Sequence, residues 1–205
     1  MSRSCEEDPA FDYLMMLFLE TTAEPLTVLP THRIVRGLGE AGVTALWDGL
    51  DQLFDVRVAE RSELCDAFGG SEGGRGGEGR FGFWTRTGGA ILSARRPAFA
   101  RILPDGGPAL RGLDVVVLGA ALEHLAGIDR EAVASADRLG FTKSVEEALE
   151  AVDSAVDGAD AAFLLEPTPV ESITAVAREG GVMPQKSTYF YPKALTGLVL
   201  NPHEW

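Results

Sequence analysis

The spacing of apolar residues predicts strands and helices from the start of the chain. Phe11 to Glu20 is apolar at both sets of alternate positions, which is typical of a strand buried on both faces inside a sheet. Leu26 to Leu29 predicts a second strand, which Pro30 ends because proline lacks the backbone donor of a sheet. From Val43 to Phe54 the apolar residues recur at a spacing of three or four, which predicts one amphipathic helix.

The middle of the chain predicts a strand, a short helix and a hairpin. The strand covers Asp55 to Glu60, and the helix covers Ser62 to Phe68 with Ser62 as its cap. The turn Gly88-Gly89 joins two further strands, Phe81 to Thr85 and Ala90 to Ala94. Pro97 to Gly107 is expected to be a loop with little regular structure.

Seven glycines fall within Gly69 to Gly79. The segment from Gly74 to Gly79 matches the pattern G-x-G-x-x-G of nucleotide-binding loops. That mechanism requires a strand before the loop and a helix after it, whereas here a helix precedes and a strand follows. We therefore expect a flexible surface loop that contacts no pocket.

The last third of the chain alternates helices and strands. Leu113 to Gly127 has the composition and length of a helix, and Gly127 suits its C-terminal end. Two sequences of the capping-box type begin further helices, at Ser144 and at Thr168. The remaining segments are strand candidates: Leu139 to Lys143, Ala161 to Leu165, Lys186 to Lys193 and Thr196 to Leu200.

This order of elements predicts an α+β or α/β fold with one mixed sheet and packed helices, formed by residues 1–205 as a single module. The net charge of −13 disfavours nucleic acid and anionic membranes as partners. The chain begins without a secretion signal, no apolar run is long enough to span a bilayer, and the two cysteines have no metal-ligand spacing. We expect a cytoplasmic protein without a metal site of its own.

The densest group of polar chemistry lies between Met183 and Lys193. In an acidic chain, its lysines and hydroxyls favour a site for phosphate, because lysine provides a point charge and hydroxyls provide donors. The alternative is a terminal strand whose aromatic residues pack and whose lysines protect an edge. The candidate phosphate-binding residues here are Lys186, Ser187, Thr188, Tyr189, Tyr191 and Lys193.

His32 and Arg33 follow the predicted end of a strand, where α/β folds place ligand-binding groups. The alternative is a surface loop with a structural histidine. We predict that Lys186, Ser187 and Thr188 lie within reach of His32 or Arg33 and form one concave site.

The segment from Met183 to Lys193 followed by Gly197-Leu198-Val199 resembles the C-terminal signature of the prokaryotic domain-of-unknown-function 1015 family. Three other segments occur in the matching order: Pro30 to Arg33, Leu113 to Val115 and Leu164 to Val170. The resemblance implies a chain about twice as long, whose first half carries a G-H-H-R motif absent here. It also implies a histidine where this sequence has Gly119.

The G-H-H-R element of that family is similar in kind to one in a fold that includes an ADP-dependent free-serine kinase. The resemblance thus implies one wall of a nucleotide-dependent phosphotransferase acting on a small hydroxy metabolite, with ADP or ATP and a divalent metal as cofactors. It further implies a missing N-terminal half as partner, or self-association in its absence. A non-catalytic module for ligand binding or assembly is the alternative.

Overall fold

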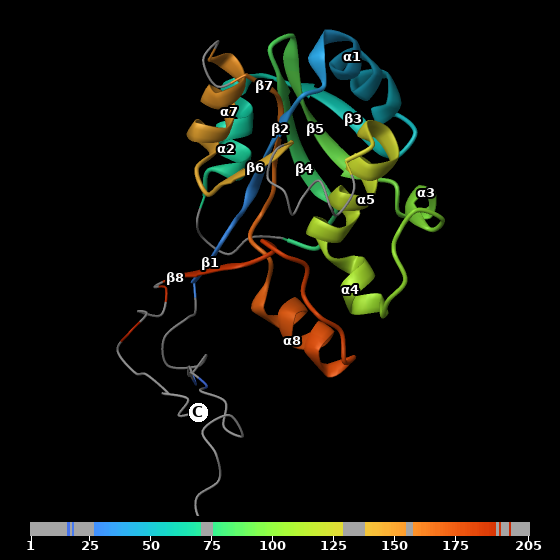
Figure 1. The fold of residues 1–205 in the computed structure, drawn as a ribbon, viewed down its shortest axis with the longest axis vertical. Helices are drawn as coiled ribbons and strands as arrows, with labels where there is room; N and C mark the ends of the chain where they lie inside the picture. Colours follow the sequence, from blue (N-terminus) through green and yellow to red (C-terminus); the bar gives the residue numbers. More distant parts are fainter. Residues whose placement is uncertain are drawn as a thin grey trace, which may run out of the picture. The chain divides into compact units, whose positions relative to one another are not determined.

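A six-stranded sheet is the framework of residues 28–189 in this computed structural model (Figure 1). Its strands lie in the order β3-β5-β4-β7-β2-β6, and every pairing within the sheet is antiparallel. The strands are β2 (His32–Arg36), β3 (Phe54–Ala59), β4 (Arg80–Thr85), β5 (Gly88–Ala94), β6 (Leu139–Thr142) and β7 (Ala159–Leu164).

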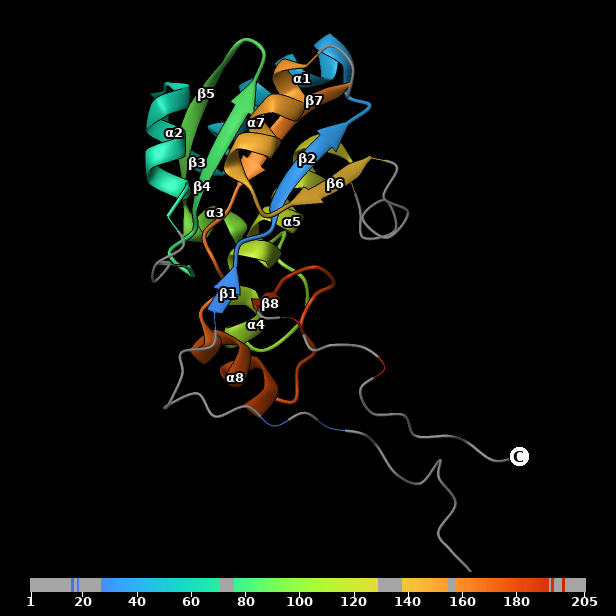
Figure 2. The ribbon, with the colours of Figure 1, turned by 90° about the vertical axis from the view of Figure 1, so that its left-hand side faces the viewer.

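Helices cover both faces of this sheet, on its left and right in Figure 1, and Figure 2 looks onto the face that the left-hand helices cover. On one face lie α1 (Gly39–Leu50) and α5 (Asp114–Ala126), and on the other lie α2 (Arg61–Phe68) and α7 (Val145–Asp153). Neighbouring residues of a strand point to opposite faces, so Val35 packs in the core of α1 and α5 whereas Ile34 packs in that of α2 and α7. The sheet is therefore buried from both sides.

The structure describes residues 16, 18, 27–70, 76–128, 138–154, 158–191, 193 and 197. The chain divides into two units, residues 28–189 and a unit formed by residues 1–27 with 190–205.

β1 (Thr27–Leu29) and β8 (Tyr189–Tyr191) form a separate two-stranded sheet. The remaining helices of the described ranges are α3 (Arg96–Phe99), α4 (Pro108–Gly112) and α8 (Val170–Arg178). No helix within these ranges is long and apolar enough to cross a bilayer.

The predicted α+β class with one sheet and packed helices is confirmed, although the sheet is antiparallel rather than mixed. The hairpin of β4 and β5 is confirmed, but its turn is Arg86-Thr87 rather than Gly88-Gly89, which already belong to β5. The left-handed Gly127 at the end of α5 is confirmed. Ser144 caps its helix as predicted, because its Oγ accepts the backbone N–H of Glu147, but the reciprocal bond of a capping box does not form, since the Ser144 N–H donates to the Thr142 hydroxyl. The one at Thr168 does not form: its hydroxyl donates to the carbonyl oxygen of Ser187 instead.

Several predicted boundaries are wrong. The main correction is β2, which was expected to be a loop after Pro30 but lies inside the sheet. Proline interrupts the backbone donors at one position only, so the chain resumes an extended conformation two residues later. Phe54 begins β3 rather than ending the first predicted helix. The helix α3 lies where a loop was predicted, and Ser62 does not cap α2.

The glycine-rich segment is anchored at its C-terminal end, contrary to prediction. Gly79 is buried, and the backbone N–H groups of Gly77 and Gly79 both donate to the Asp114 carboxylate, at 2.6 and 2.8 Å. At the other end, Gly69 and Gly70 line a hollow of about 130 Å³. Residues 71–75 lie outside the described part, so their predicted flexibility stays a prediction.

The predicted N-terminal strand, Phe11 to Glu20, also lies outside the described residues apart from Met16 and Phe18. These two belong to no strand, and their side chains are 64% and 85% exposed.

Candidate functional site

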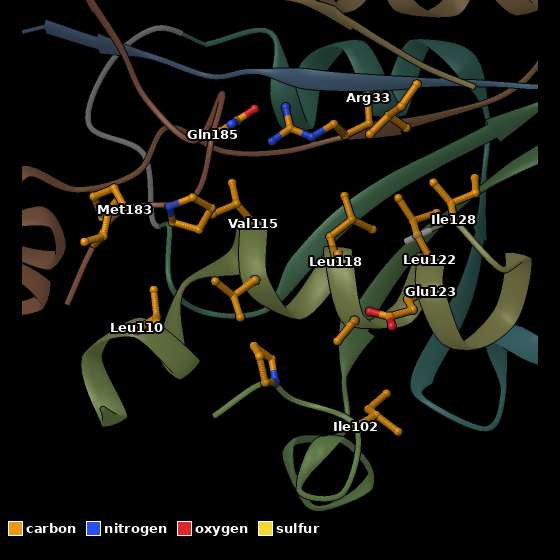
Figure 3. A pocket seen from close by; sticks show the side chains of 17 residues that line it. Arg33, Ile102, Leu110, Val115, Leu118, Leu122, Glu123, Ile128, Met183 and Gln185 are labelled. Atoms are coloured by element: carbon orange, nitrogen blue, oxygen red, sulfur yellow. The ribbon is translucent and has the colours of Figure 1, made fainter. Parts of the chain in front are cut away.

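A pocket of about 820 Å³ opens on the sheet face that carries α5 (Figure 3). Its volume lies in the range of sites that enclose small ligands. One wall is α5, another is the segment Met183-Pro184-Gln185, and further apolar side chains come from the loops around Ile102 and Ile128. Its polar side chains are those of Arg33, Glu123 and Gln185, and its apolar residues include Leu110, Val115, Leu118, Leu122, Leu139 and Met183.

Arg33 brings a buried positive charge to this pocket, because only 7% of the residue is exposed. Its Nη1 donates to the carbonyl oxygen of Thr31 at 2.9 Å, and its Nη2 donates to that of Lys186 at 3.0 Å. The guanidinium carbon lies 4.6 Å from the centre of the Phe141 ring, a favourable cation–π arrangement. Burial lowers the pKa of Arg33 to about 10, which leaves the side chain charged at neutral pH.

No carboxylate of the described residues forms an ion pair with Arg33. Removing a cation from water is costly unless an opposite charge compensates it. Carbonyl dipoles and an aromatic ring supply only part of that compensation. The pocket therefore presents a cation able to accept an anionic group of a ligand.

His32 points to the opposite face of the sheet from Arg33 and does not line the pocket. It is completely buried, and its Nδ1 accepts the backbone N–H of Leu165 at 3.1 Å. Its Nε2 has no hydrogen-bond partner in the described part of the chain. Burial, reinforced by the nearby Arg33 charge, lowers the pKa of His32 to about 4, although the Glu146 carboxylate opposes this shift. His32 is therefore a neutral core residue at neutral pH rather than a second cation of the pocket.

The segment that follows Met183 is a turn rather than the start of a strand. Lys186 has a left-handed backbone, with φ of 55°, and the Ser187 hydroxyl donates to the carbonyl oxygen of Pro184 at 2.7 Å. The Thr168 hydroxyl donates to the carbonyl oxygen of Ser187 at 3.1 Å. These bonds, with the one from Arg33 to Lys186, hold the Met183-Pro184-Gln185 wall in place.

The expected proximity of Arg33 to Lys186 is thus confirmed through the Lys186 carbonyl group. The side chains of Lys186, Ser187, Thr188 and Tyr189 do not line the pocket. Tyr189 instead has the ammonium group of Lys143 over its ring, 4.2 Å from the centre. Tyr191 and Lys193 are exposed and belong to the unit of residues 1–27 and 190–205. A phosphate-binding role for these side chains stays a prediction.

Sequence reasoning missed Gln185, Glu123 and the apolar wall of α5. Gly119 lies in that wall, and a β-carbon at this position would meet no atom within 4 Å. No group of three or more His, Cys, Asp or Glu side chains in the described ranges could hold a metal ion.

The family described as "Protein of unknown function (DUF1015)" matches residues 1–116, more than half of the chain. A search of the curated proteins found no match. Similar solved structures include a free serine kinase in complex with AMP, with 18% identity and a TM-score of 0.46, and a mutant free serine kinase in complex with ADP, with 16% identity and a TM-score of 0.46. Each likeness covers 85% of this chain and 57% of the other.

A conserved hypothetical protein from Pyrococcus furiosus has 14% identity and a TM-score of 0.47, and the likeness covers 85% of this chain and 60% of that one. The chain thus spans 57 to 60% of the length of these three solved structures. At such identities and TM-scores, the likeness carries no argument about what this chain binds.

Proposed function

The chain belongs to the DUF1015 family of proteins of unknown function, and from this premise we propose that its pocket binds a small anionic ligand of nucleotide size. The observation that carries the proposal is the buried guanidinium of Arg33, which has no carboxylate partner among the described residues and lines a pocket of about 820 Å³. A phosphate group would supply the missing negative charge, and arginine can donate to it through two parallel N–H groups.

The remainder of the pocket suits the uncharged part of a nucleotide. Val115, Leu118 and Leu122 present an apolar surface along α5. A flat base and a ribose bury their faces against such a surface, while a few polar groups fix their orientation. We expect ADP or ATP to bind with its phosphates at Arg33 and its base along α5.

In this proposal the chain forms one wall of a cytoplasmic, nucleotide-dependent phosphotransferase. Phosphoryl transfer depends chiefly on positioning and on the neutralisation of charge, which are the roles proposed for Arg33. The exposed side chain of Lys186, beside Gln185 of the pocket wall, is proposed to hold phosphate as it enters. The described residues offer no fitting metal site, so no step through a divalent metal is assigned to them.

One observation favours the alternative of a non-catalytic ligand-binding module. Among the described residues, the polar side chains that line the pocket are those of Arg33, Gln185 and Glu123, and none of these is an evident nucleophile. Incubation with [γ-³²P]ATP and small hydroxy compounds separates the two candidates. Phosphate transfer favours the phosphotransferase, whereas nucleotide binding without transfer favours the binding module.

Thermal unfolding with ADP, ATP and inorganic phosphate tests the proposed binding. A nucleotide that binds only the folded protein stabilises it by about 2.7 kcal/mol when its concentration is one hundred times its dissociation constant.

Two variants of Gly119 form a matched pair for this measurement, because this position has open space for a side chain. Gly119→Ala should keep the response to ADP, while Gly119→Phe should fold and lose it because the ring occupies the pocket. A full response in the Gly119→Phe protein would contradict the proposal.

A further inference from the structure

Among the described residues, Arg33 is the only buried charged residue that lines the pocket. The other two residues with polar side chains in the lining, Gln185 and Glu123, are exposed. The Thr31 and Lys186 carbonyl groups accept hydrogen bonds from Nη1 and Nη2 of Arg33. Further N–H groups of the guanidinium remain, so the interior of the pocket offers one cation with free donors to one anionic head group.

The rest of the buried lining is aliphatic. Leu118, Leu122, Ile128 and Leu139 are all buried there, and Met183 adds a flexible thioether side chain. Within the described residues, no aromatic ring lines the pocket. Such a lining stabilises a ligand in proportion to the apolar area that it buries, without the stacking that aromatic rings offer to a flat base.

The wall formed by α5 has room for an aliphatic chain. Gly119 is exposed in that wall, and a β-carbon there would meet no atom within 4 Å. One turn away on either side, Val115 and Leu122 provide aliphatic surface. A flexible chain can follow this gap, whereas a charged body would lose its hydration there without compensation.

The lining as a whole thus matches a single anionic group on an aliphatic body. We infer that the pocket binds an amphipathic carboxylate of medium chain length, with its head group on Arg33 and its chain along α5. A carboxylate carries one negative charge, equal and opposite to that of the guanidinium, and its two oxygens match two parallel N–H groups. This class of ligand goes beyond the nucleotide of the proposed function and is argued independently of it.

Isothermal titration of the 205-residue protein with hexanoate, octanoate and octanol, each below the concentration at which it aggregates, tests both ends of the ligand. The dissociation constant of the carboxylates should fall about fourfold for each added methylene. Octanoate should bind at least about tenfold more tightly than octanol, because only the carboxylate gives Arg33 a charged partner. Changing the head group of the ligand leaves the pocket wall intact, whereas replacing Arg33 would release the Lys186 carbonyl group.

Two matched variants place a phenyl ring inside and outside the pocket. Gly119→Phe should abolish the binding of octanoate, because the ring occupies the space beside α5. Val58→Phe, at an exposed position of β3 outside the lining, should leave it unchanged. Octanol bound as tightly as octanoate, an affinity that does not grow with chain length, or full binding of octanoate to the Gly119→Phe protein would each overturn the inference.

Titration with ADP separates this inference from the proposed function. Binding of octanoate without binding of ADP would overturn the proposed function and support the inference. Binding of ADP without binding of octanoate would overturn the inference and leave the proposed function standing. Where both bind, each should weaken the binding of the other because they share Arg33, and independent binding of the two would overturn the inference.

Discussion

His32 and Arg33 are adjacent in the sequence but have different surroundings and charges. Both are buried in β2, and the alternation of the strand sends one side chain toward α7 and the other toward α5. Arg33 remains a cation because the Thr31 and Lys186 carbonyl groups accept its hydrogen bonds. His32 remains neutral because burial beside that cation disfavours a second positive charge. Only one of the pair is therefore available to an anionic ligand.

The neutral state of His32 predicts acid sensitivity. Between its ordinary pKa of 6.5 and its folded pKa of about 4, the unfolded chain takes up a proton that the folded protein does not. The free energy of unfolding should therefore fall as the pH is lowered through this range, by about 3 kcal/mol in all. His32→Asn should remove this loss, because asparagine can accept the Leu165 N–H but does not titrate.

Urea unfolding at pH 7 and pH 4.5 measures the effect. The exposed His124 provides the control, and His124→Asn should keep the acid sensitivity of the unmodified protein. An equal loss of stability in the His32→Asn protein would show that another group is responsible.

At the scale of elements, α5 links the core to the pocket. Val117 and Ala121 belong to the core against the sheet, Val115 and Gly119 line the pocket, and Leu118 does both. Asp114 fixes the start of this helix, because its carboxylate accepts two backbone N–H groups from the end of the glycine-rich segment. Burial raises the pKa of Asp114, and these two hydrogen bonds oppose that shift.

We predict that Asp114→Ala lowers the free energy of unfolding by about 1 to 3 kcal/mol, because the buried N–H of Gly79 loses its acceptor. Asp114→Asn should cost less, since its amide oxygen can still accept one bond. Chemical unfolding measures both, with the exposed Asp48→Ala on α1 as a control expected to stay within about 0.5 kcal/mol. A cost no larger than that of the control would mean that this contact does not hold the segment.

The sequence predicted those elements whose signals are local. The β4–β5 hairpin, the Ser144 cap and the end of α5 each depend on a few neighbouring residues. β2 was missed because only Ile34 and Val35 follow the polar pair, and its neighbours β6 and β7 are more than one hundred residues away in the chain. Strand pairing at that separation leaves no local signal.

The site was predictable only in part for the same reason. Arg33 and the Met183 to Lys193 segment stood out by residue type, and the bond from Arg33 to the Lys186 carbonyl joins them. The wall of α5 did not stand out, because this helix is apolar both toward the core and toward the pocket. The separation of His32 from Arg33 also required knowing that β2 is a strand.

At the scale of the whole molecule, exposed apolar side chains predict self-association. Among the described residues of the unit formed by residues 1–27 and 190–205, Met16, Phe18 and Tyr191 are 64%, 85% and 60% exposed. We expect the 205-residue chain to form oligomers or aggregates in size-exclusion chromatography with light scattering. Phe18→Ser should reduce this association more than Val58→Ser, a change at an exposed position of β3.

Co-expression with a partner that carries a G-H-H-R motif is expected to suppress the association. A monodisperse monomer of the unmodified chain would contradict this prediction.

The proposed function of the pocket depends on Arg33 binding the anionic group of a ligand. A crystal structure of the protein with ADP tests it directly, because it locates the phosphates. We expect phosphate oxygens about 2.7–2.9 Å from the Arg33 guanidinium nitrogens, with the base along α5 above Gly119. ADP bound elsewhere on the protein, or an empty pocket at saturating ADP, would contradict it.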